Sequence, residues 1–151
     1  MGGLLLTFGT ALGYAATGPA APLEADLKSA YCLPILTLNK ATLEILEYDD
    51  PALERGRQSA IRTAEAGIRQ LERYLESRAK LVDQAPLISA SGRGVADYKL
   101  MLAAAESCSG QCMPGPNRTA QEAARCSIDC QAAKEPAVAR ANACRSAAWL
   151  P

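Results

Sequence analysis

The sequence predicts an all-α fold, a bundle of four or five helices held together by disulfide bonds. Apolar residues make up 49% of the 151 residues, yet only 5% are aromatic. Alanine, the strongest helix former, supplies much of the apolar fraction and buries little area per residue. Six cysteines, an even number, are present. We therefore expect one helical domain with a thin core, in which each disulfide adds roughly 2–4 kcal/mol of stability.

Residues 1–21 are typical of an export signal. The apolar run over residues 4–16 is too short to cross a bilayer comfortably, and small residues follow it at spacings that signal peptidase accepts. The candidate −3/−1 pairs are Gly13/Ala15 and Gly18/Ala20. Because no Lys or Arg precedes the run, a retained anchor or a buried helix remains an alternative.

All six cysteines lie after this segment, in the predicted helical domain over residues 22–151. We expect a periplasmic or secreted protein, because exported chains with several cysteines are more often disulfide-bonded than thiol-bearing. The mature chain would have no stable membrane span unless the N-terminal segment is retained.

Residues 22–48 predict the first helical unit. Pro34 interrupts the pattern, so the helix either kinks there or ends near Leu33, with Pro34 opening a second helix. Cys32 lies beside this interruption. The apolar positions at helical spacing are Leu27, Tyr31, Ile35, Leu38, Thr42 and Ile45.

Residues 51–84 carry the strongest helical pattern of the chain. Asp50 is a plausible N-cap, and Pro51 suits the first helical position. We expect this helix to be the central one of the bundle, although a coiled-coil partner surface is the alternative. Its apolar stripe comprises Ile61, Ala64, Ile68, Leu71, Leu75 and Val82.

Pro86 and the Ser/Gly cluster at residues 89–94 predict an interruption before the next helix, over residues 95–112. Its stripe would place the first cysteine pair on the buried face. Two further helices are expected, over residues 118–134 and from Pro136 to beyond Cys144. The stripe consists of Val95, Tyr98, Leu102 and Ala105.

Two Cys-x3-Cys pairs flank a connector that contains Pro114 and Pro116. A spacing of four places both thiols of a pair on one helix face, and the prolines prevent the connector from being helical throughout. The result is an antiparallel helical hairpin whose cysteines face each other. Six cysteines allow many connectivities, and geometry favours Cys108–Cys130 and Cys112–Cys126, which leaves Cys32–Cys144.

This twin motif, with thirteen residues between its pairs, resembles that of the small Tim chaperones of the mitochondrial intermembrane space. The resemblance covers about a sixth of the chain. It implies two stapled helices whose outer surfaces hold apolar client segments, and it supports the pairing geometry of the hairpin.

Thiolates at this spacing on facing helices are also good Cu(I) ligands, because soft donors match a soft ion. The alternative function is therefore a Cu(I)-binding helical bundle, to which Met101 and Met113 could add thioethers. Zinc at the same four cysteines is less typical, because structural zinc prefers shorter spacings within each pair. Apart from these alternatives, we expect no cofactor and no metal.

Composition also argues against several function classes. The formal net charge is zero, with 16 basic and 16 acidic residues and no extended basic block, so nucleic acid is not expected as a partner. Histidine, the commonest general base, is absent. We predict no catalytic residues. The expected function is an exported, disulfide-stabilised binding or structural protein with a protein partner: an adaptor, chaperone-like carrier, inhibitor, immunity-type protein or accessory subunit.

Overall fold

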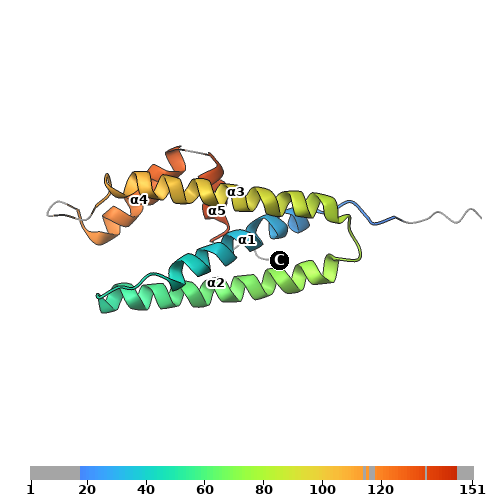
Figure 1. The fold of residues 1–151 in the computed structure, drawn as a ribbon, viewed down its shortest axis with the longest axis horizontal. Helices are drawn as coiled ribbons and strands as arrows, with labels where there is room; N and C mark the ends of the chain where they lie inside the picture. Colours follow the sequence, from blue (N-terminus) through green and yellow to red (C-terminus); the bar gives the residue numbers. More distant parts are fainter. Residues whose placement is uncertain (1–17, 114, 116–117, 135, 146–151) are drawn as a thin grey trace, which may run out of the picture.

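A computed structural model describes residues 18–113, 115, 118–134 and 136–145 (Figure 1). Within these ranges the chain forms five helices, so the all-α prediction is confirmed. Most of the predicted export signal, residues 1–17, lies outside the described residues. The helices are α1 (Glu24–Glu44), α2 (Pro51–Arg78), α3 (Gln84–Ser109), α4 (Ala120–Lys134) and α5 (Pro136–Ala143). None of these helices is long and apolar enough to cross a membrane.

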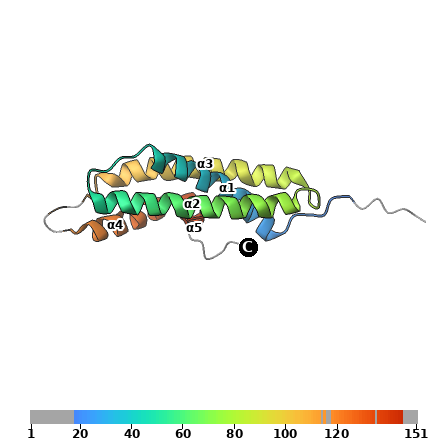
Figure 2. The same ribbon diagram turned by 90° about the horizontal axis from the view of Figure 1, so that it is seen from below.

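Helix α1 lies at the centre of the fold and packs against both α2 and α3 (Figures 1 and 2). The extensive helix contacts of α2 are with α1, whereas α4 and α5 pack on α3 and on each other. The expectation that the 51–84 helix is central is therefore wrong. The reason is that α2 buries a single stripe that includes Ile61 and Leu71, and the rest of its surface is largely charged.

Helix α3 runs without a break through the segment where an interruption was predicted. Asp83 caps it by accepting a hydrogen bond from the Ala85 amide at 3.1 Å, and Pro86 falls in the first turn, where no amide donor is needed. Gly94 is where α3 crosses α1, because a Cβ there would overlap the carbonyl oxygen of Tyr31. Tertiary packing thus keeps a glycine-containing segment helical that would be weak in isolation.

Helix α1 likewise continues through Pro34, so the alternative of two separate helices is wrong. The Pro34 ring faces the same crossing, with its Cγ 3.2 Å from where a Gly94 Cβ would lie. A proline and a glycine, both helix-weakening residues, therefore meet where the two helices approach closely.

The start of α2 matches its prediction. Asp50 Oδ1 accepts hydrogen bonds from the amides of Ala52 at 2.6 Å and Leu53 at 3.1 Å, and Pro51 occupies the first helical position. Its end comes earlier than predicted, at Arg78.

The connection from α2 to α3 binds the segment before α1. The Ala20 amide donates to Leu81 at 2.9 Å, and the Asp83 amide donates to Ala20 at 2.9 Å. These two backbone hydrogen bonds tie Ala20, which precedes α1, to the α2–α3 connection.

The larger buried cluster lies where α1, α2, α3 and α5 meet, and the smaller one lies near the α2–α3 connection. Ile45 was predicted to be buried but is 80% exposed, because α1 ends at Glu44. On α3 Tyr98 is buried, as predicted, but in the next turn Met101 and Ala104 are buried in place of the predicted Leu102, which is exposed. The larger cluster contains Cys32, Ile35, Leu36, Leu71, Tyr98, Met101, Ala104, Val138, Ala141 and Cys144.

Candidate functional site

All six cysteines form disulfides, and none is free. The pairs are those that the facing cysteines predict, and their Cα–Cα distances lie within the usual range for a disulfide. The bonds are Cys32–Cys144 at 5.4 Å, Cys108–Cys130 at 6.0 Å and Cys112–Cys126 at 5.5 Å between Cα atoms.

These bonds argue against the Cu(I) alternative, because sulfurs bonded to each other present no thiolate to a metal. The same argument applies to zinc at Cys108, Cys112, Cys126 and Cys130. The two methionines that could have added thioethers do not lie together at one site either. Met101 is buried in the core, whereas Met113 is 65% exposed at the hairpin connector.

The hairpin of α3 and α4 depends on these bonds. Cys108 and Cys112 are buried, as predicted, although Cys112 lies just beyond the end of α3. The Cys112 amide still donates to the Cys108 carbonyl at 3.1 Å, so the helical spacing of the pair is kept. At the start of α4, Glu122 and Thr119 cap each other reciprocally, and the Thr119 backbone hydrogen bond lowers the pKa of Glu122.

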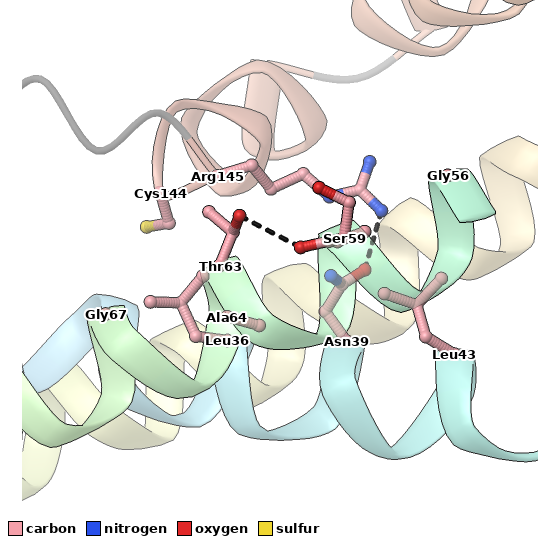
Figure 3. A pocket seen from close by; sticks show the side chains of 11 residues that line it. Leu36, Asn39, Leu43, Gly56, Ser59, Thr63, Ala64, Gly67, Cys144 and Arg145 are labelled. Carbon is pink, nitrogen blue, oxygen red and sulfur yellow. Dashed lines mark hydrogen bonds between the residues drawn. The ribbon is translucent and has the colours of Figure 1, made fainter.

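A groove of about 470 Å³ lies between α1, α2 and the C-terminal end of α5 (Figure 3). This volume falls within the range of small-molecule and peptide side-chain sites. On α1 it is lined by Leu36, Asn39 and Leu43, which repeat at three and four and therefore share one face. On α2 it is lined only by small residues, namely Gly56, Ser59, Ala60, Thr63, Ala64 and Gly67.

The third wall is held in place by a disulfide. Cys144 follows α5 and is bonded to Cys32 of α1, so that Cys144 and Arg145 lie over the groove (Figure 3). The bond closes a separation of 112 residues, which makes this wall a product of the tertiary fold rather than of local sequence.

Arg145 is the ionisable side chain in this lining, which among the described residues contains no carboxylate. Its guanidinium donates to Asn39 Oδ1 at 2.6 Å (Figure 3) and to Asn142 Oδ1 at 3.5 Å. The residue as a whole is exposed, but protein atoms crowd the guanidinium enough for desolvation to lower its pKa. Among the hydroxyls, Thr63 already donates to the Ser59 carbonyl at 3.0 Å. The groove is thus mostly apolar, with a cation at its edge that pairs with no carboxylate of the described residues.

Two buried carboxylates elsewhere join helices. Asp26, which has no exposed surface, accepts from Arg78 Nε at 2.9 Å and from the Tyr74 hydroxyl at 2.9 Å. The Arg78 hydrogen bond is the main reason why the pKa of Asp26 is lowered. This cluster ties α1 to α2.

Asp97 makes the corresponding link between α1, α3 and α5. It accepts from the Tyr31 hydroxyl at 2.6 Å and from Arg140 Nη2 at 3.2 Å. Burial, together with this carboxylate, raises the pKa of Tyr31 to about 12. The polar groups of both clusters satisfy one another, so we assign them a structural role.

Sequence reasoning identified the cysteines but missed the groove. One signal was present, because α2 carries a row of small residues at helical spacing, at positions 56, 59, 60, 63, 64 and 67. The pairs Asp26–Arg78 and Asp97–Arg140, separated by 52 and 43 residues, left no local signal.

The chain matches no protein-family model, and no curated protein or solved structure is significantly similar to it. The resemblance to the small Tim chaperones therefore rests on the spacing of Cys108, Cys112, Cys126 and Cys130 alone.

Proposed function

We propose that this protein is an exported, disulfide-stabilised helical binding protein that holds a segment of a protein partner in the groove between α1, α2 and the end of α5. The observation that carries the proposal is the groove itself, whose third wall is locked by the Cys32–Cys144 bond. A preformed site of this kind binds without the cost of ordering its own walls.

The disulfides support the exported location. Three bonds persist in an oxidising compartment and are rare where thiols are kept reduced. The binding-competent form is therefore the fully oxidised one.

Exposed apolar side chains near one end of the groove support a protein partner. Ile45 is 80% exposed and Leu53 is 53% exposed, and both lie close in sequence to groove residues, Leu43 and Gly56 respectively. Exposed apolar side chains close to a mostly apolar groove add surface that a protein partner could cover. Tyr48, 41% exposed in the same connection, adds an aromatic ring.

The lining supports binding rather than catalysis. Its ionisable group is Arg145, which stays protonated and cannot act as a general base. Its hydroxyls come from Ser59 and Thr63, and no carboxylate or second cation lies beside them in the lining to activate a nucleophile.

The test is site-specific photo-crosslinking in the cells that produce the protein. A photoreactive side chain replaces Ala66, which is exposed one turn beyond Thr63 at the groove edge, and in the control it replaces Ala103, exposed on α3. We expect a discrete protein adduct from position 66, none from position 103, and loss of the adduct in the Cys32→Ala/Cys144→Ala variant. No adduct from position 66, or equal adducts from both positions, would contradict the proposal.

A further inference from the structure

We infer that residues 146–151 of this chain bind in the groove when no partner is present, with the Trp149 ring against the small residues of α2, and that a partner segment binds by displacing them. The inference rests on the proposed function and names how that site is regulated. Three features support it: the position of Arg145, the shape of the groove wall and the residues that follow Arg145 in the sequence.

The described part of the chain ends within the groove lining. Cys144 and Arg145 both line the groove, and the Cys32–Cys144 bond fixes the backbone there. The Arg145 guanidinium adds a second anchor, because it donates to Asn39 Oδ1 on α1 at 2.6 Å (Figure 3). Residue 146 follows by one peptide bond, so the segment begins beside the groove.

The segment is long enough to reach most of the groove. Along α2 the lining extends from Gly56 to Gly67, which at 1.5 Å per residue is about 16 Å. Trp149 lies four residues after Arg145, and an extended chain of that length spans up to about 14 Å. From a starting point within the lining, the Trp149 ring can thus be placed along most of this length.

The groove wall and the segment are complementary in size. On α2 the wall consists only of glycine, alanine, serine and threonine, and Leu36 and Leu43 offer apolar contacts on α1. Large side chains pack best against small ones, because protein interiors are as dense as organic crystals. The segment has the sequence Ser-Ala-Ala-Trp-Leu-Pro, so Trp149 and Leu150 supply the large apolar groups that this wall lacks.

The groove also suits the polar part of the tryptophan side chain. A buried indole N–H usually finds a hydrogen-bond acceptor. Ser59 and Thr63 place hydroxyl oxygens in the lining. The Thr63 hydroxyl donates its hydrogen to the Ser59 carbonyl at 3.0 Å, which leaves its oxygen able to accept. Both parts of the Trp149 side chain are therefore accommodated.

The N-terminal segment is a poorer occupant, because it joins the described chain at the other end of α2. Ala20 is hydrogen-bonded to Leu81 in the α2–α3 connection. From Gly67, the last lining residue of α2, to Arg78, where α2 ends, the helix rises about 16 Å. Residues 146–151 are thus the segment that adjoins the groove.

A tethered segment competes effectively even when its own contacts are few. A short linker gives an effective concentration in the millimolar range. With an intrinsic Kd of about 0.1 mM, the segment would fill the groove in roughly nine of ten molecules and would weaken partner binding by about tenfold. A partner segment with more extensive contacts still displaces it, so the groove is regulated and remains usable.

Trp149 is the probe for the test, because it is the single tryptophan of the chain. Its fluorescence in the oxidised chain is compared with that of the free peptide Ser-Ala-Ala-Trp-Leu-Pro. We expect emission at shorter wavelength than from the peptide, and acrylamide quenching weaker by at least about threefold, since most molecules shield the ring. Emission and quenching equal to those of the peptide would overturn the inference. A shift that grows with protein concentration would do so too, because the groove would then hold the segment of a second copy.

Two pairs of variants test whether the groove is what shields Trp149. Gly56→Leu fills the groove from α2, and Gly92→Leu on α3 is its matched control, because a Cβ at either glycine meets no other atom. Ala60→Phe and its control Ala103→Phe replace exposed alanines in the same way. We expect each groove variant to increase quenching by at least about threefold and each control to leave it within about 1.5-fold.

Circular dichroism checks that each variant keeps its helices, and the second pair decides if a member of the first does not fold. Equal quenching in groove variants and controls would place Trp149 elsewhere and contradict the inference.

The outcomes separate this inference from the proposed function. Removal of residues 146–151 should raise the yield of the partner adduct from position 66 by about tenfold at partner concentrations well below saturation. An adduct whose yield is unchanged by the removal, together with an exposed Trp149, would refute the inference and leave the proposed function standing. A shielded Trp149 without any adduct from position 66, even after the removal, would contradict the proposed function and with it the displacement by a partner.

Discussion

The three long helices and the α3–α4 hairpin are held together in different ways. The long helices bury large side chains, such as Ile35 and Leu71, and the carboxylate of Asp26 with its partners on α2. In α4, Ala123 is the buried residue among the described side chains, yet two disulfides join this helix to the end of α3. Where burying side chains yields little free energy, covalent bonds take over the role of packing.

The Cys32–Cys144 bond lies in the long-helix region, where it fastens the end of α5 to the core. It is also the bond that completes the groove. Stability and the candidate site are therefore coupled at this one disulfide, whereas the two hairpin bonds lie outside the groove lining.

The largest effect is expected when that long-range bond is removed. Because Cys32–Cys144 spans 112 residues, the Cys32→Ala/Cys144→Ala variant should lose about 4–5 kcal/mol of unfolding free energy. Urea unfolding followed by circular dichroism measures this loss. A loss no larger than that of a hairpin variant would show that the two regions do not differ in the way described.

A smaller and more local effect is expected in the hairpin. The Cys112–Cys126 bond spans 14 residues, so the Cys112→Ala/Cys126→Ala variant should lose about 3 kcal/mol. Hydrogen exchange should accelerate in α4 and remain unchanged in α1 and α2, because α4 packs on α3 and α5 and has no extensive contacts with α1 or α2 among the described residues. Faster exchange throughout the chain would contradict the separation of the two regions.

Two glycines of α3 give a matched pair within the long-helix region. Gly94→Ala should destabilise the protein by about 1–3 kcal/mol or more, because its Cβ would overlap the Tyr31 carbonyl oxygen where α1 and α3 cross. Gly92→Ala, two residues earlier with no atom near its Cβ, should instead stabilise it by up to about 1 kcal/mol. Thermal unfolding of both variants measures the contrast, and shifts of the same sign would show that helix propensity, rather than the crossing, decides.

The smallest effect is expected on the pH dependence. The pKa of Asp26 is lowered in the folded protein, so its stabilising contribution is present above the ordinary Asp pKa of about 4 and is lost as the pH falls through the lowered value. Asp26→Asn should therefore be less stable at neutral pH and should flatten the acid side of the stability profile. Unfolding between pH 2 and pH 7, in steps of about one unit, measures this.

Glu122→Gln in the hairpin is the matched control. The pKa of Glu122 is also lowered, chiefly by the Thr119 backbone hydrogen bond, but the carboxylate is exposed. Water competes for such a carboxylate, so we expect a weaker change in the acid profile than for Asp26→Asn. A control effect equal to that of Asp26→Asn would place the acid sensitivity in the hairpin rather than in the long helices.

Local chemistry in the sequence was sufficient for several features. The cap at Asp50 and Pro51 and the spacing of the two Cys-x3-Cys pairs each depend on residues within one or two helical turns. The hairpin pairing follows once two such pairs face each other, and Cys32–Cys144 then follows by elimination. These predictions succeeded because the physical interactions that they describe are short-range in sequence.

The continuity of α3 through residues 89–94, the central place of α1 and the groove with Arg145 at its edge were decided by tertiary structure. Each of them depends on which helix surfaces meet. Glycine at position 94 weakens an isolated helix yet permits α1 and α3 to cross closely, and no local pattern shows which of these two roles prevails. The sequence alone therefore determined that the chain is helical and which cysteines pair, whereas packing between distant residues determined where α3 begins, which helix became the core and where the groove formed.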